Sequence, residues 1–274
     1  MIVADVMLDH PSWLPNPDGT ACRTVRTGSA VWAVVVTPTG DGTVIPALSL
    51  VRGTGPPPAF DLIDPTVLSG PRELAAPLLK AGVVARLANP DLWDALATAI
   101  VRQVIRAGQA RTLYRAFCRE HGDEVRTSAG STWLFPSPET VLALPDAEFT
   151  RLRMAFKRRP LQAAARTYLD RATAWAGLDH TRLVSTVQAV PRIGPWTAGA
   201  AVADATNDYS LYPFADLSLR TWARRLAPGL DWPDSEPEFA ATWRKLAGEQ
   251  LSQWTLLTLA WGVRRARHDG AAAL

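Results

Sequence analysis

The apolar pattern of this chain changes once, at a run rich in glycine and proline that spans residues 53–58. Before the run, two short apolar stretches at residues 30–37 and 43–51 flank turn residues, which predicts a β-hairpin. After about residue 65, apolar residues recur at helical spacing in about nine or ten short segments. We therefore expect a mainly helical α+β fold, with a β-containing domain over residues 1–64 and a helical region over residues 65–274.

Capping residues indicate where several helices begin. Asp91, Ser137 (which stands before a proline) and Asp146 each precede a helical stretch, so each is expected to be an N-cap. Pro160 is expected to open a further helix, because proline suits a first turn and disfavours helical geometry in the residue before it. The basic residues before Pro160 would then lie on a loop.

Composition excludes several classes of protein. Of the 274 residues, 47% are hydrophobic and 20% are charged, which is typical of a globular chain. No run of about 20 apolar residues could span a membrane, and the N-terminus lacks the pattern of a secretory signal. Cys22 and Cys118 are too few for a disulfide scaffold, a four-cysteine zinc site or a four-cysteine iron–sulfur cluster. We expect a cytoplasmic monomer.

The basic residues are almost all arginine and are unevenly placed. Only three of the 29 are lysine, and residues 151–171 hold six Arg and one Lys against one Asp. Arginine suits bidentate recognition of phosphate, so a basic segment on a chain of net charge +3 indicates a surface that faces a polyanion. The alternative is an arginine-rich composition whose charges only solvate helix faces.

Residues 183–203 read as two helices joined by a tight turn. Pro191 stops the first helix, Gly194 is expected to take a positive φ in the turn, and Pro195 suits the first position of the second helix. The free N–H groups at the start of that helix, together with its dipole, form a site for an anion. An ordinary helical hairpin without a ligand is the alternative.

About twenty residues later, Asp216 stands at the boundary between a loop and a helix, in the segment Pro213-Phe214-Ala215-Asp216-Leu217. Taken alone, Asp216 is an N-cap.

Together these segments resemble the helix-hairpin-helix (HhH-GPD) DNA glycosylase superfamily, and within it the 3-methyladenine DNA glycosylase II, or alkylbase, branch. The hairpin of that family, L-P-G-I-G-x-W-T-A, corresponds to V-P-R-I-G-P-W-T-A at residues 190–198. Its P-x-D-D-L-x-L-R segment corresponds to P-F-A-D-L-S-L-R at residues 213–220. The segments at 91–103 and 135–139 also match, so the resemblance covers about residues 85–265.

Two residues depart from the family pattern. Arg192 replaces the first glycine of the hairpin, and Ala215 replaces the first aspartate of the Asp-Asp pair. The second aspartate, which the resemblance marks as catalytic, is present as Asp216.

The resemblance implies a monofunctional DNA glycosylase that acts on double-stranded DNA containing damaged bases. Such an enzyme flips an alkylated purine out of the duplex, hydrolyses its N-glycosidic bond and leaves an abasic site. Asp216 would stabilise the positive charge that develops on the sugar. An alkylated base that already carries a positive charge leaves without a strong general acid. A lyase would need a lysine just after the hairpin, where this chain has Trp196, and none of its three lysines is near in sequence.

The resemblance also assigns roles in binding. Backbone groups at Gly194 and Trp196, with Thr197 and Arg192, would hold a phosphate. Val104, with Gln103 beside it, would fill the gap left by the flipped base; alternatively, Val104 is a core residue. The remaining implied residues are Lys157, Arg158 and Arg159 on the DNA backbone, Trp261 and Trp196 in the base pocket (or in the core), and the carbonyls of Gln188, Val190 and Ile193 around a structural sodium or potassium ion.

No cofactor is expected to be required. Two other functions remain open at this point. Arg192 and Ala215 also fit a non-catalytic DNA-binding relative of the family. A glycosylase for oxidised or mismatched bases is the third reading, although the absence of the lysine and of a four-cysteine cluster argues against its common forms.

Overall fold

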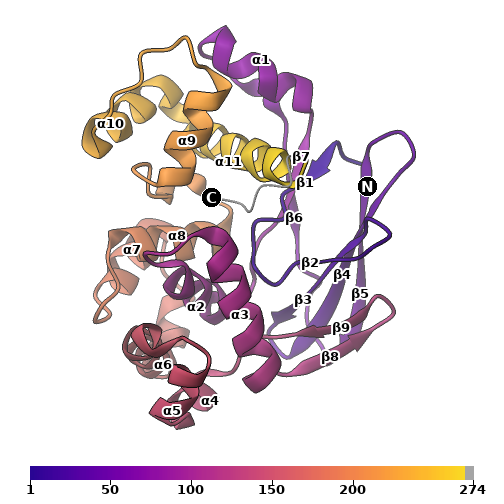
Figure 1. Cartoon of the computed structure of the whole chain (residues 1–274), viewed down its shortest axis with the longest axis vertical. Coiled ribbons are helices and arrows are strands. Elements are labelled where there is room, and N and C mark those ends of the chain that lie inside the picture. Colours follow the sequence, from indigo (N-terminus) through magenta and orange to yellow (C-terminus); the bar gives the residue numbers. More distant parts are fainter. Residues whose placement is uncertain (269–274) are drawn as a thin grey trace.

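The computed structural model describes residues 1–268 and shows the expected α+β fold (Figure 1). The strands are β1 (Asp5–Val6), β2 (Leu14–Pro15), β3 (Ala21–Thr27), β4 (Ala30–Pro38), β5 (Val44–Arg52), β6 (Phe60–Ile63), β7 (Val84–Leu87), β8 (Glu124–Thr127) and β9 (Gly130–Trp133). The α-helices are α1 (Arg72–Ala81), α2 (Leu92–Arg102), α3 (Ala107–His121), α4 (Pro138–Ala143), α5 (Asp146–Arg151), α6 (Ala155–Trp175), α7 (His180–Gln188), α8 (Pro195–Thr206), α9 (Leu217–Leu226), α10 (Glu236–Ala247) and α11 (Leu251–His268). Short 3-10 helices are η1 (Pro65–Val67), η2 (Tyr209–Leu211) and η3 (Gly248–Gln250).

The predicted hairpin is confirmed as β4 and β5, which belong to an antiparallel sheet of order β2-β3-β4-β5. Its turn is held by the hydroxyl of Thr39, which donates to the carbonyl oxygen of Thr43 at 2.9 Å. One face of this sheet packs on a small core that includes Val25, Val34 and Trp13. Burial along these strands does not alternate, because the first five residues of β3 are all buried and Val31 of β4 packs in a separate cluster with Val125 and Leu134.

Strands that follow residue 64 also belong to the β-sheet region. In a second sheet, of order β1-β7-β6, the central strand β7 pairs in parallel with β1 and antiparallel with β6. Strands β8 and β9 form a further hairpin. The expectation that residues 65–274 are helical throughout is wrong at these strands. All four residues of β7 are buried, so this strand shows no alternation from which a short apolar run could be recognised as β.

Two of the three predicted N-caps are confirmed, and the other predicted helix starts differ from the structure. Asp91 caps α2 by accepting from the backbone N–H groups of Trp93 and Asp94, and Ser137 caps α4, as predicted. Asp146 is the first residue of α5 rather than its cap. Helix α6 begins at Ala155 and contains Pro160, so the predicted start at Pro160 is wrong.

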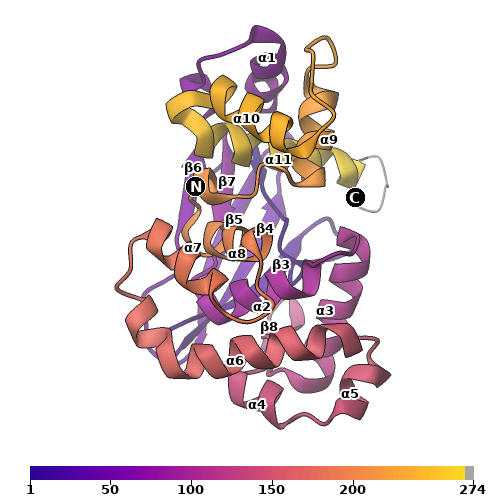
Figure 2. The same ribbon diagram turned by 90° about the vertical axis from the view of Figure 1, so that its left-hand side faces the viewer.

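The helices form two groups beside the sheets (Figures 1 and 2). One group contains α1, α9, α10 and α11, and the other contains α2 to α8. Both share one large core rich in tryptophan, in which Trp93, Trp175, Trp243 and Trp254 are almost fully buried. Within residues 1–268, no helix combines the length and the apolar character that crossing a membrane requires.

Candidate active site

The turn between α7 and α8 is the predicted helical hairpin, but the residue with a positive φ is not the predicted one. Pro195 is the first residue of α8, as expected. The positive φ belongs to Arg192, at 71°, whereas Gly194 has φ −86° and is the N-cap. The prediction for Gly194 is therefore wrong. A Cβ added at Gly194 would meet no atom within 4 Å, so the surface of the turn is open at this position.

The N-terminus of α8 presents backbone donors. Helix α8 has no side-chain cap, so the first N–H groups, including that of Trp196, lack an intrahelical partner. Arg192 and Gly194 are exposed beside them. The hydroxyl of Thr197 has a different role from the predicted phosphate contact, because this side chain is buried and accepts a 2.8 Å hydrogen bond from Nε2 of Gln103.

Asp216 is an N-cap, as its sequence context predicts, and its carboxylate has a second partner. It is the N-cap of α9, with Oδ1 accepting from the N–H groups of Ser218 (2.9 Å) and Leu219 (3.4 Å). Its Oδ2 accepts from the indole nitrogen of Trp196 at 2.8 Å. Asp216 is half-buried, and the bond from Trp196 places its carboxylate beside the first turn of α8. Trp196, predicted for the base pocket, holds this carboxylate instead of standing free.

Residues in contact with Asp216, though not Asp216 itself, line a cavity of about 60 Å³. Ser218, the residue that Asp216 caps, lines it, and so does Tyr212. Burial, followed by the charge of Asp216, raises the pKa of the Tyr212 phenol. Further lining side chains come from the loop after β1, from α2, α3 and η2, and from α9: Asp9, Arg102, Arg111, Tyr209 and Trp222.

Trp261, the other predicted pocket residue, packs edge-on against Trp222, with ring centroids 6.1 Å apart. Trp222 is the residue that lines the cavity, together with Gly262. A Cβ on Gly262 would come within 2.3 Å of the Trp222 ring, so a glycine is needed for this close packing. Sequence reasoning missed Trp222 and Asp9, because nothing local distinguishes them from core or surface residues; it placed Arg102 on a surface that contacts the DNA backbone or only solvent, whereas the side chain lines the cavity.

Val104, the candidate gap-filling residue, is fully exposed and has φ 59°. The alternative that it belongs to the core is therefore wrong. A positive φ is unusual for a β-branched side chain and costs conformational energy. The neighbouring Gln103 connects this loop to the hairpin, because its side chain donates a hydrogen bond to Thr197 in α8.

The basic triplet before Pro160 lies in α6, not on a loop. Lys157 is 1% exposed and donates to the carbonyl oxygen of Gln103, so it braces the loop that carries Val104 and is not available as a surface contact to DNA. Burial lowers its pKa to about 8. Arg158 forms an ion pair with Asp146, and Arg159 is exposed.

The carbonyl groups predicted to hold a monovalent cation lie in the turn after α7. That of Val190 already accepts from the N–H of Ile193 at 3.0 Å, which leaves one lone pair for an ion. The carbonyls of Gln188 and Ile193 flank it in sequence. Within residues 1–268, no cluster of His, Cys, Asp and Glu suits a metal ion. The cation site therefore stays a prediction.

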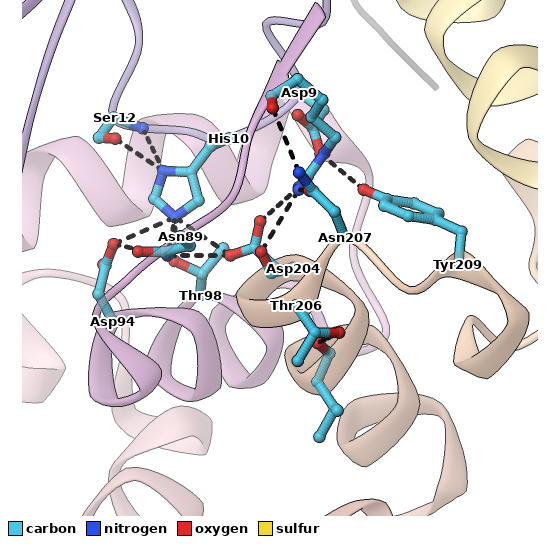
Figure 3. A network of polar contacts seen from close by, with 12 residues as sticks. Asp9, His10, Ser12, Asn89, Asp94, Thr98, Asp204, Thr206, Asn207 and Tyr209 are labelled. Atoms are coloured by element: carbon cyan, nitrogen blue, oxygen red, sulfur yellow. Dashed lines mark hydrogen bonds and ion pairs between the residues drawn. The ribbon is translucent and has the colours of Figure 1, made fainter. Parts of the chain in front are cut away.

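A buried polar network joins the sheets to the helices behind the cavity (Figure 3). The guanidinium of Arg86, 1% exposed, donates to Asp9 at 3.0 Å and to Asp204 at 2.5 Å. The ring of His10 lies between Ser12 and the hydroxyl of Thr98, with Nε2 3.9 Å from Oδ2 of Asp204. Because Asp9 also lines the cavity, this network holds one cavity wall in place.

The fold is shared with DNA glycosylases of known structure. MBOgg1 in complex with a low-affinity DNA ligand superposes with a TM-score of 0.69 at 16% identity, over 95% of this chain and 90% of that one. The 3-methyladenine DNA glycosylase of Archaeoglobus fulgidus gives 0.68 at 18%, over 93% and 90%. The 8-oxoguanine glycosylase/lyase of Clostridium acetobutylicum bound to double-stranded DNA gives 0.67 at 14%, over 96% and 90%.

The match to a relative of known activity covers a smaller part of the chain. The DNA-3-methyladenine glycosylase of Bacillus subtilis (strain 168) is 23% identical over 138 residues, which are 47% of this chain and 44% of that protein. The chain thus matches less than half of that relative's length. No family model matches the chain. The fold implied by the sequence resemblance is confirmed by the structural matches.

Proposed function

We propose that this chain, which has the fold of the helix-hairpin-helix DNA glycosylases, is a monofunctional DNA glycosylase. It hydrolyses the N-glycosidic bond of alkylated purines in duplex DNA and leaves an abasic site. The observation that carries the proposal is the position of Asp216, whose carboxylate accepts from Trp196 in the first turn of α8 and caps Ser218, a residue that lines the cavity. A phosphate held at the N-terminus of α8 would bring a deoxyribose close to the carboxylate.

The chemistry assigned to Asp216 is electrostatic. As the bond between C1′ and the base nitrogen lengthens, positive charge builds up on the sugar, and a carboxylate beside C1′ lowers the energy of that state. The donors at Trp196 and at the start of α9 hold the carboxylate in one orientation, so little reorganisation is needed during the reaction. The electron pair of the broken bond stays on the base and neutralises its positive charge, a water adds its hydroxyl to C1′, and the proton of that water passes to solvent.

The exposed loop at Val104 supplies the second requirement, which is removal of the base from the stack. An apolar side chain that projects fully from the surface can occupy the gap in the duplex. The cavity is small in the free protein, so entry of the base displaces water and moves lining side chains.

Hydrolysis, rather than lyase chemistry, is supported by the surroundings of Asp216. Trp196 stands where a lyase would carry its lysine, and the amine of Lys157 is buried against Gln103. Borohydride treatment during the reaction should therefore trap no covalent adduct between protein and DNA. Recovery of such an adduct would contradict the monofunctional mechanism.

The function is tested with Asp216→Asn and a panel of lesion-containing duplexes. The wild type should release a base from at least one alkylated duplex, and the variant should lose about a hundredfold or more of that rate while it keeps its DNA affinity. Salt-dependent binding without base release by the wild type would identify a non-catalytic DNA-binding protein instead. An Asn variant as fast as the wild type would show that another group acts.

A further inference from the structure

One side chain connects the loop that carries Val104 to the helical hairpin. Gln103 is the C-cap of α2, and its amide nitrogen Nε2 donates to the hydroxyl of Thr197 in α8 at 2.8 Å. The same nitrogen donates to the carbonyl oxygen of Arg192, in the turn of the hairpin, at 3.4 Å. Because Gln103 directly precedes Val104 in the chain, the exposed valine is held at a fixed place relative to the hairpin.

Gln103 is also held by a third element. Its carbonyl oxygen accepts from the amine of Lys157, which lies in the first turn of α6. This carbonyl stands at the C-terminal end of α2, where the helix dipole is negative, so the end of the helix favours a cationic amine at this position. The main chain and the side chain of Gln103 are therefore both fixed, and by different helices.

The two turns that Gln103 connects both contain a residue in the left-handed region of the backbone. Val104 has φ 59° and Arg192 has φ 71°. Neither residue is a glycine, so each conformation costs free energy and persists only where the surrounding contacts hold the turn. The amide of Gln103 is a contact that the two turns share, since it follows one turn into the other.

We infer that Gln103 is a positioning residue, which sets the spacing between a phosphate held at the N-terminus of α8 and the base step that Val104 enters. This inference rests on the proposed function. Successive nucleotides of one strand rise by about 3.4 Å, so a shift of the loop by that distance relative to the hairpin would bring Val104 to the wrong base. Gln103 itself does not fill the gap, because its amide donates to two acceptors within the protein. It acts through Val104 and Thr197.

The test removes the contact from each side with a variant of nearly the same shape. Gln103→Met keeps the length of the side chain without its N–H donors, and Thr197→Val removes only the hydroxyl that accepts. The substrate is the alkylated duplex that the wild type processes fastest, together with the same lesion in single-stranded DNA. Each variant should release the base from the duplex about three- to tenfold more slowly in a single turnover. Both should keep the wild-type rate on the single strand and the wild-type affinity for DNA.

Two further measurements separate positioning from a general loss of structure. Because both variants remove one contact, the double variant should be no slower than the slower single variant. A 2-aminopurine placed beside the lesion should show slower unstacking in all three proteins. The control is Gln109→Leu, which removes an exposed amide from α3 and should behave as the wild type. Thermal unfolding checks that each variant is folded.

Several outcomes would overturn the inference. Equal losses on duplex and single-stranded DNA would give Gln103 a structural role only, and losses that multiply in the double variant would show that Gln103 and Thr197 act independently. Weaker DNA binding in Thr197→Val alone would mean that its hydroxyl contacts a phosphate. Wild-type rates in both single variants would overturn the inference and leave the proposed function standing. A wild type that releases no base from any alkylated duplex would overturn both.

Discussion

The indole nitrogen of Trp196 lies 2.8 Å from Oδ2 of Asp216 and donates a hydrogen bond to it. The two residues are twenty positions apart and belong to the first turn of α8 and the N-cap of α9. The contact connects the turn that can hold a phosphate with the carboxylate that can act on the sugar. In the proposed mechanism, one side-chain hydrogen bond therefore joins the phosphate site to the reacting carboxylate.

Replacement of Trp196 by Phe should slow base release about tenfold or more. The ring volume is largely kept, but the carboxylate loses a donor, and a hydrogen bond to a charged group contributes about 1.5–3 kcal/mol. Single-turnover rates measure the effect, and thermal unfolding checks that the fold is intact. Trp261→Phe is the matched control, since Trp261 packs on Trp222. Equal rates in the wild type and Trp196→Phe would show that the contact does not orient Asp216.

Val104→Gly should make the protein more stable and less active. Glycine accepts a φ of 59° without the strain that valine carries, so we expect a gain of about 1 kcal/mol in the free energy of unfolding. Release of a paired base should fall, because no side chain fills the gap in the duplex. The same lesion in single-stranded DNA, which has no gap to fill, should be processed at the wild-type rate. An equal loss on both substrates would contradict the role of Val104 in the duplex.

Lys157 should make stability rise with pH above about pH 8. Its folded pKa is about 8, and the unfolded lysine titrates near 10.5, so between these values the unfolded chain binds more protons and the folded state is favoured as pH increases. Urea unfolding at pH 7.5 to 10 measures this rise in the free energy of unfolding. The rise should be absent in Lys157→Met. It should remain in the control Lys80→Met, because Lys80 is exposed. If the free energies of unfolding of the wild type and Lys157→Met differ by the same amount at every pH in this range, Lys157 has an ordinary pKa.

His10 should weaken the fold in acid. Burial and the charge of Arg23 lower its pKa to about 3, while the unfolded value is 6.5. Stability from this group is complete above pH 6.5 and falls toward pH 3, with a slope of about 1.4 kcal/mol per pH unit at its steepest. Chemical denaturation between pH 7 and 4 measures it. His10→Gln should reduce the slope, whereas His180→Gln, at an exposed position, should not. An unchanged slope in His10→Gln would assign the acid sensitivity to carboxylates.

The fold class and the centre of the site were predictable because their signals are local. Pro195 at a helix start, Asp216 before a helix and the β4–β5 turn each depend on backbone geometry within a few residues. Boundaries that depend on packing were predicted less well. Pro160 lies inside α6 because Lys157 and the buried face of that helix outweigh the preference of proline for a first turn.

The sequence by itself determined the two-part architecture and the helical hairpin, since hydrophobic period and turn residues are local signals, and its resemblance to a known family made Asp216 a candidate. Tertiary structure alone decided that Val104 projects into solvent, that Lys157 turns inward, and that Arg102 faces a cavity. Each of these outcomes depends on what a distant segment offers: a carbonyl, a charge or an unfilled space. Sequence spacing cannot predict such partners, because they are brought together only when the helices pack.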